Sequence, residues 1–183
     1  MRLKYLTQSQ LRRFFSVIQP KRDRCLFGLV YHYGLRVTEA TLLKRADVDL
    51  SQGTIFIYRV KSGVSGEKPL LSNTASLLSA YLPVRLATDE ALFTGRQGNL
   101  GRHRIQQLFR QYASQAGLSG VTVHSLRHSI ATHLLDAGFN IEVVQDHLGH
   151  RNIQSTLIYA QITNHRRAKI YAQIDRSRAI VNV

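Results

Sequence analysis

Five residues of this chain have the side-chain types needed to attack a phosphodiester without a metal ion: Arg36, His124, Arg127, His150 and Tyr159. Arginine is the side chain best shaped to hold a phosphate through two parallel hydrogen bonds. Tyrosine can act as a covalent nucleophile. Two arginines, two histidines and a tyrosine on a very basic chain therefore point to the transfer of DNA strands.

The charge of the chain indicates a polyanionic partner. Its 183 residues include 25 Lys and Arg against 11 Asp and Glu, which gives a formal net charge of +14 and a pI of about 10.6. An excess of this size is typical of proteins that bind nucleic acid. A basic protein without such a partner, or one that binds anionic membranes, is the alternative.

The length and the cysteine count suit one domain in a reducing compartment. Cys25, the only cysteine, lies in an apolar run and is expected to be buried, and no intrachain disulfide is possible. The N-terminus has no apolar segment of signal-peptide length, and no run approaches the roughly 20 apolar residues that span a bilayer. We therefore expect a soluble, nucleoid-associated protein of the cytoplasm that has no membrane partner.

The periodicity of apolar residues predicts a mainly helical domain of the α+β class. Thr7 and Gln10 form a capping box ahead of a first helix that runs to about Gln19. Glycines at positions 117, 138 and 149 fit helix ends. Further helices are expected at residues 22–33, 38–43, 74–85, 102–115, 126–137, 141–147, 153–160 and 165–176.

One small antiparallel sheet is expected near the N-terminal third of the chain. Residues 54–60 are rich in β-branched and aromatic side chains and predict a strand. A turn at residues 61–66 leads to a returning segment at 68–71. Residues 85–100 are predicted to be a loop with a short extended piece at 91–93. No repeat or linker interrupts the chain, so we expect a single domain over residues 1–176, followed by a tail at 177–183.

Each candidate residue also has a plainer interpretation. Arg36 lies near an expected helix start, where Glu39 could hold it in a simple salt bridge. His124 could cap a helix and Arg127 could be a surface charge, although the start of a helix also favours an anion. The i, i+4 spacing of His124 and His128 can suit two metal ligands, but no Glu lies between them and no Cys cluster completes a site. We expect no metal and no cofactor.

Lys61 lies in the Gly-containing turn of the expected hairpin. Lysines at hairpin tips are usually solvated, yet a flexible turn can bring a proton donor to a leaving oxygen. Tyr159 is one of eight tyrosines and would be assigned to the core if it were considered alone. Lys61 and Tyr159 are therefore candidate site residues only in combination with the other residues of the set.

Taken together, these motifs resemble the tyrosine site-specific recombinases, also called the integrase family. The resemblance covers nearly the whole chain, and the matching residues occur in the family's order: Gly34-Leu35-Arg36-Val37-Thr38-Glu39, Lys61, His124-Ser125-Leu126-Arg127-His128, Leu148-Gly149-His150 and Tyr159. Within the family, the chain looks most similar to the short fimbrial phase-variation invertases. Three segments carry that similarity: Arg59 to Gly63 with Pro69-Leu70-Leu71, Leu148 to Ile153, and Gly117-Leu118-Ser119.

Two departures from the family pattern stand out. Most members carry a separate N-terminal helical DNA-binding domain, and here the first motif already begins at Gly34, so we expect no such core-binding domain. The hairpin also has Glu67-Lys68 where an arginine often precedes the proline. Lys61 is favoured over Lys68 as the catalytic lysine, but both remain candidates.

The resemblance implies a role for each residue. Arg36 and Arg127 would clamp the non-bridging oxygens of the scissile phosphate, and His150 would add a hydrogen bond. His124 would help take the proton of Tyr159, which would attack and form a 3′-phosphotyrosyl link. Lys61 would protonate the departing 5′ oxygen, and no ATP or metal would be required. The residues expected to support these groups are Glu39 and His128.

The resemblance also implies partners. These are double-stranded DNA with inverted-repeat target sites, further copies of the chain in a tetramer on paired sites, and accessory DNA-bending proteins. The expected outcome is inversion of a DNA segment such as a fimbrial promoter switch, although excision and integration stay open. Two other functions also stay open: cutting and resealing like a type IB topoisomerase, and DNA binding by a regulator with little recombination activity.

Overall fold

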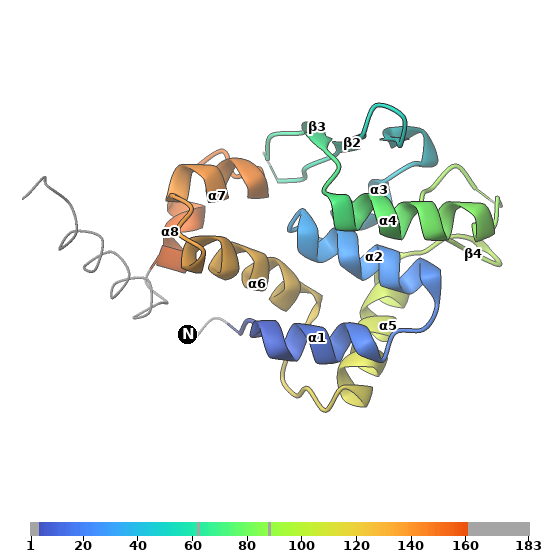
Figure 1. Ribbon diagram of the computed structural model, residues 1–183, viewed down its shortest axis with the longest axis horizontal. Coiled ribbons are helices and arrows are strands. Elements are labelled where there is room, and N and C mark those ends of the chain that lie inside the picture. Colours follow the sequence, from blue (N-terminus) through green and yellow to red (C-terminus); the bar gives the residue numbers. More distant parts are fainter. Residues whose placement is uncertain (1–3, 62, 88, 161–183) are drawn as a thin grey trace, which may run out of the picture.

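The computed structural model describes residues 4–61, 63–87 and 89–160. Within these residues helices dominate and strands are short, which confirms the predicted mainly α class (Figure 1). The predicted helix at 165–176 and the tail at 177–183 lie outside the described residues. The α-helices are α1 (Gln8–Ser16), α2 (Lys21–His32), α3 (Val37–Leu42), α4 (Ser72–Tyr81), α5 (Arg102–Gln115), α6 (Val123–Asp136), α7 (Ile141–Leu148) and α8 (Gln154–Ala160).

Helix α1 begins at the predicted capping box. The Thr7 hydroxyl accepts a hydrogen bond from the Gln10 backbone N–H at 3.3 Å, and the Gln10 side chain accepts one from the Thr7 N–H at 2.9 Å. These two bonds satisfy backbone donors that have no partner inside the helix. The helix ends at Ser16, earlier than the predicted Gln19. Leu11 and Phe14 are the buried residues of this helix.

Helix α2 lies in the middle of the molecule, as its nearly continuous apolar sequence predicts (Figure 1). It contacts α3, α4 and α6. Cys25 is fully buried in it, as expected. Phe27 of α2 meets Phe14 of α1 and Phe109 of α5 in an aromatic cluster, with 4.9 Å between the ring centroids of Phe14 and Phe109.

The main sheet is antiparallel, with strand order β1-β2-β3. The predicted hairpin is present as β2 (Thr54–Ile57) and β3 (Gly66–Pro69), and a two-residue strand β1 (Val48–Asp49) adds an edge that was not predicted. Strand β2 ends at Ile57 instead of the predicted Val60. The chain leaves the sheet there because Arg59 and Val60 bond to Glu39 of α3.

A second pair of short strands corrects the prediction of a loop at residues 85–100. Strand β4 (Thr94–Gly95) pairs with β5 (Gly98–Asn99). Gly98 has a φ of +97°, a conformation open to glycine and needed for this tight reversal. Helix α4 also stops earlier than predicted and is followed by a 3₁₀ turn, η2 (Leu82–Val84), at Pro83; a further 3₁₀ turn, η1 (Arg45–Asp47), precedes β1.

Helices α6, α7 and α8 contact one another and form one side of the molecule (Figure 1). Helix α6 starts at Val123, three residues before the predicted Leu126, because Thr122 and Ser125 form its N-terminal cap. His124 and Arg127 therefore lie in its first two turns. A small apolar cluster joins the three helices: Ile130, Ala131, Leu135, Val144, Leu148 and Tyr159. None of the described helices is long and apolar enough to cross a bilayer.

Candidate active site

A buried carboxylate lies at the centre of the candidate site. Glu39 of α3 is fully buried, and its Oε1 accepts a hydrogen bond from Arg36 Nη1 at 2.6 Å. Its Oε2 accepts bonds from the Arg36 backbone N–H at 2.8 Å and from Arg59 Nη1 at 2.9 Å. Arg127 Nη1 lies 3.8 Å from the same oxygen. Three arginines thus converge on one carboxylate.

Glu39 is ionised in this setting. Burial alone would raise its pKa, but the Arg36 N–H and the charges of Arg59 and Arg127 act in the opposite direction, and its pKa is lowered overall. A buried charge is tolerated when it is paired and hydrogen-bonded, as it is here. The salt bridge between Arg36 and Glu39 that the sequence suggested is confirmed, but it is one part of a larger cluster.

Arg127 is buried and bonds to two other segments of the chain, the turn at Gly34 and residues 148–150. Its Nη1 donates to the Gly34 carbonyl oxygen, and its Nη2 donates to the Leu148 carbonyl oxygen at 3.0 Å. The same Nη2 lies 2.6 Å from His150 Nε2. Burial and the charge of Arg36 lower the pKa of Arg127 to about 10, so it remains protonated at neutral pH. Arg127 is therefore a fixed, positively charged group and not the surface charge of the alternative interpretation.

His150 is neutral and oriented by two partners. Burial, with the charges of Arg127 and Arg36, lowers its pKa to about 4. Because arginine can only donate, Nε2 accepts from Arg127 and the proton resides on Nδ1, which faces Thr156 Oγ1 at 2.9 Å. Thr156 was not predicted, and its place one helical turn before Tyr159 on α8 was the available signal. In this structure His150 bonds to Arg127, at the edge of the arginine cluster.

Tyr159 is 3% exposed, and its hydroxyl lies 3.0 Å from His128 Nδ1. The resemblance implied that His124 takes the proton of Tyr159 and that His128 has a supporting role. In this structure, the histidine in contact with the Tyr159 hydroxyl is His128. His124 is exposed, with its ring centroid 6.3 Å from that of His128. Burial raises the pKa of Tyr159, and the charges of Arg127 and Arg36 oppose this rise. The phenol is thus held beside the arginine cluster.

The two candidate lysines have different surroundings. Lys68 of β3 forms an ion pair with Asp146 of α7, with 2.8 Å between Nζ and Oδ2. Lys61 is exposed on the loop between β2 and β3. The pKa of His124 is lowered mainly by burial, then by the charges of nearby arginines, and also by the charge of Lys61. The surroundings favour Lys61 as the lysine available to a bound substrate.

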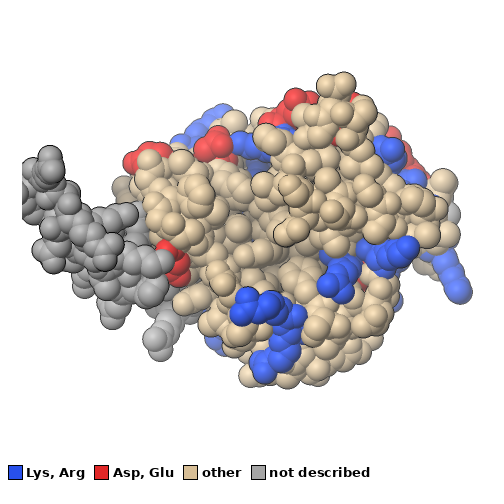
Figure 2. All heavy atoms as spheres, viewed as in Figure 1, with Lys and Arg blue, Asp and Glu red and all other residues tan. Residues whose placement is uncertain are grey.

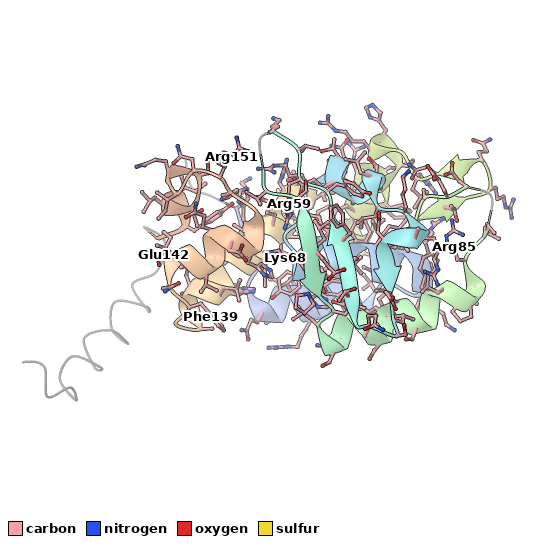
Figure 3. All side chains as sticks on the ribbon, turned by 90° about the horizontal axis from the view of Figure 1, so that it is seen from above. Arg59, Lys68, Arg85, Phe139, Glu142 and Arg151 are labelled. Carbon is pink, nitrogen blue, oxygen red and sulfur yellow. The ribbon has the colours of Figure 1, made fainter. Side chains whose placement is uncertain are left out.

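Arg59 is a member of the site that sequence reasoning missed. It is buried, and its Nη2 donates to the carbonyl oxygens of Tyr33 at 2.8 Å and His147 at 2.9 Å. The signal was the alternation of the strand, since Ile55 and Ile57 face the core and the next residue on that face is Arg59. Figure 3 shows Arg59 at the end of the hairpin that lies beside α7.

The cluster is suited to bind an anion. Its arginines outnumber its single carboxylate, and the Arg36 side chain remains 21% exposed, so a ligand can reach it. Among the described residues, no group of His, Cys, Asp and Glu side chains has the arrangement of a metal site. The face drawn in Figure 2 is largely uncharged, so it accounts for only part of the excess of basic residues.

We predict that the free energy of unfolding rises between pH 5 and about pH 6.5. The pKa values of His128 and His150 are lowered to about 4 in the folded protein, mainly by burial, against about 6.5 in an unfolded chain. The unfolded chain therefore binds more protons in this range, and folding is favoured as they leave. Urea unfolding at several pH values measures this slope, which His128→Asn should reduce. A flat profile in wild type would contradict the lowered pKa values.

Comparison with known proteins gives a consistent picture. A model of the phage integrase family matches residues 4–166. Tyrosine recombinase XerA of Thermococcus kodakarensis is 39% identical over 166 residues, which cover 87% of this chain and 58% of that protein. Tyrosine recombinase XerC of Chlamydia pneumoniae is 37% identical over 149 residues, covering 78% of this chain and 47% of that one.

Solved structures agree with this comparison. The crystal structure of XerA recombinase matches with a TM-score of 0.81 and 29% identity over 95% of this chain and 66% of that one. XerH site-specific recombinase bound to difH substrate, in a pre-cleavage complex, matches with a TM-score of 0.72 and 25% identity over 92% of this chain and 52% of that one. This chain thus spans about half to two thirds of the length of these relatives.

Proposed function

This chain belongs to the phage integrase family, and we propose that it cleaves and rejoins DNA through a covalent bond between Tyr159 and a DNA 3′ phosphate. The observation that carries this proposal is the place of the Tyr159 phenol, buried beside His128 and next to the arginines gathered around Glu39. A nucleophile and a set of fixed positive charges are the two parts that phosphoryl transfer requires.

In the proposed reaction, the scissile phosphate lies against Arg36 and Arg127. Their guanidinium groups hold the non-bridging oxygens and stabilise the charge that develops on them. When DNA is bound, the proton of His150 moves from Nδ1 to Nε2, which donates a hydrogen bond to a phosphate oxygen, while Nδ1 accepts from the Thr156 hydroxyl. Glu39 fixes the two arginines, since its carboxylate accepts from Arg36 and lies 3.8 Å from Arg127.

The Tyr159 oxygen then bonds to phosphorus while the bond from phosphorus to the 5′ oxygen breaks. The phenol proton passes to a histidine: the resemblance implies His124, and in this structure the hydroxyl contacts His128. Lys61 gives a proton to the departing 5′ oxygen. A 5′ hydroxyl from another strand reverses the step, and because the bond energy is kept in the adduct no ATP is consumed.

The proposed partner is double-stranded DNA. The net charge of +14 supports this, as do the structures of XerH bound to difH substrate and of the Tn1549 transposon integrase in complex with a circular intermediate DNA. We further propose inverted-repeat target sites, a tetramer on paired sites, and accessory DNA-bending proteins, because exchange between two sites requires several copies to act together. The proposed catalytic domain covers residues 1–176, with residues 177–183 as a contact segment.

We also propose that the product is an inverted DNA segment, as in fimbrial phase variation. The support for this finer proposal is the sequence of the hairpin, Arg59 to Gly63 with Pro69-Leu70-Leu71, which resembles that of the fimbrial invertases. An inversion assay on a plasmid that carries two oppositely oriented target sites separates inversion from excision. Relaxation of supercoils without any recombinant product would instead indicate a topoisomerase-like activity.

The experiment that tests the proposed activity is covalent capture of DNA. The wild-type chain is mixed with nicked duplexes of random sequence around a central position, and DNA that stays with the protein after denaturation is recovered and sequenced. We expect a specific sequence linked through its 3′ phosphate to Tyr159, located by mass spectrometry. DNA that binds without forming any denaturation-resistant adduct would point to a regulator and overturn the proposal.

Cleavage should not depend on a metal ion. The positive charge that metal ions supply in other phosphoryl-transfer enzymes is supplied here by Arg36, Arg127 and Lys61. Adduct formation in excess EDTA is therefore expected at the untreated rate, measured on a captured sequence. Strict dependence on Mg²⁺ would indicate a nuclease mechanism and contradict this role for the arginines.

A further inference from the structure

Arg59 is a buried arginine to which the reaction described above gives no role. Its side chain is 1% exposed, and its donors are directed to Glu39, Tyr33 and His147. It is therefore placed to hold protein segments and not to touch DNA. These segments are the hairpin, the end of α2 and the C-terminal end of α7. A buried guanidinium requires such complete pairing, and removing one partner of a buried pair is strongly unfavourable.

The loop that carries Lys61 is attached to the arginine cluster just before that residue. The Val60 backbone N–H donates to Glu39 Oε1 at 3.3 Å, and the Val60 carbonyl oxygen accepts from Arg36 Nη1 at 3.4 Å. Lys61 itself has a φ of +56°, which residues other than glycine seldom adopt. Such a backbone conformation persists where the surrounding contacts impose it.

The same loop is attached again after Lys61. The Val64 N–H donates to the Gly149 carbonyl oxygen at 3.1 Å, and the Arg59 N–H donates to Ser65 Oγ at 2.9 Å. The Arg59 side chain lies directly against Gly149, where a Cβ would come within 2.7 Å of Arg59 Nε. Arg59 therefore joins the base of the loop to the turn that precedes His150.

We propose that Arg59 is the positioning residue of Lys61, which it places so that its ammonium can give a proton to the 5′ oxygen. This inference rests on the proposed strand cleavage. In that step the bond between phosphorus and the 5′ oxygen breaks, the oxygen takes a proton from Lys61, and the lysine is left neutral. Arg59 acts through the loop, since it holds both Glu39 and the backbone beside Gly149.

The test uses a leaving group that needs no proton. A duplex of the captured sequence is made in two forms, with oxygen or with sulfur at the 5′ bridging position of the scissile phosphate. Sulfur leaves as a thiolate, because thiols ionise near a pKa of about 8.5 and alcohols do not. A defect in proton donation is therefore relieved on the sulfur duplex, whereas a defect in folding or phosphate binding slows both duplexes.

We expect Arg59→Met to slow single-turnover cleavage of the oxygen duplex by about 10²-fold or more, which is the usual size of a lost proton transfer, and to leave the sulfur duplex within about threefold of wild type. Lys61→Ala should show the same pattern. Arg127→Ala should be slow on both duplexes. Arg85→Met is the matched control, because Arg85 also donates to backbone carbonyls, those of Ala91 and Leu92, but lies toward the end of the molecule away from α7 and Arg59 (Figure 3).

A second variant keeps the test decisive if Arg59→Met does not fold. Ser65→Ala removes an exposed hydroxyl that accepts the Arg59 N–H, and it should give the same selective loss on oxygen with a smaller amplitude. Equal slowing of the two duplexes by folded Arg59→Met, or by Ser65→Ala, would overturn the inference. So would wild-type rates on both. A wild-type protein that forms no adduct with either duplex would overturn the proposed cleavage itself.

Discussion

Tyr159→Phe should form no covalent adduct with DNA and should bind the same DNA with nearly unchanged affinity. The substitution removes the phenolic oxygen, which is the proposed nucleophile, and its contact with His128 at 3.0 Å. The ring keeps its place in the apolar cluster of α6, α7 and α8. Adduct formation on a nicked duplex of the captured sequence measures the first effect, and a gel shift measures the second.

A matched control separates loss of the nucleophile from loss of a buried hydroxyl. Tyr81 is also buried, and its hydroxyl donates to the Leu92 carbonyl oxygen at 3.0 Å, away from the arginine cluster. Tyr81→Phe should therefore form adducts at the wild-type rate. A denaturation-resistant adduct in the Tyr159→Phe protein would show that another residue is the nucleophile.

Arg36→Ala and Arg127→Ala should each slow cleavage by about 10²–10³-fold, the usual cost of removing one preorganised charge donor, and weaken binding much less. Both residues contribute to the positive charge around Glu39, and the proposed phosphate binding uses the planar fork of each guanidinium. Lysine at either position should restore little activity, because a lysine cannot form two parallel hydrogen bonds. Single-turnover cleavage and half-site binding measure the two effects.

Arg36 and Arg127 differ in the backbone contacts that their side chains make. Arg127 also donates to the backbone of Gly34 and Leu148, so the thermal stability of its variants must be measured alongside cleavage. Arg36 is 21% exposed and makes fewer backbone contacts, so Arg36→Ala is the cleaner test of charge. A fully active Arg127→Lys protein would assign Arg127 a structural role only.

The helices of this fold were predictable because their signals are local. The capping box at Thr7, the apolar sequence of α2 and the glycine ends of helices are contained in short segments. The strands were less predictable. Strand β2 ends early because Arg59 and Val60 bond to Glu39, which is distant in sequence, and β4 and β5 are too short to have a periodicity.

Sequence motifs named several residues of the candidate site, but they missed Arg59 and Thr156 and did not reveal the connections between the residues. Family motifs named Arg36, Arg127, His150 and Tyr159, and the structure brings them together. The motifs did not reveal that one carboxylate holds three arginines, because that arrangement depends on packing between α3, the hairpin and α6. The contact of Tyr159 with His128 instead of His124 also depends on how α8 packs against α6.

The cluster around Glu39 has a consequence for the charge balance of the folded chain. Three guanidinium groups and one carboxylate leave an excess of two positive charges in a largely buried place. Burial is the main cause of the lowered pKa of Arg127, and repulsion from the charges of Arg36 and Arg59 lowers it further. A bound phosphodiester supplies a negative charge where the fold lacks one. If the proposed function is correct, the DNA backbone is a counterion of the folded chain as well as its substrate.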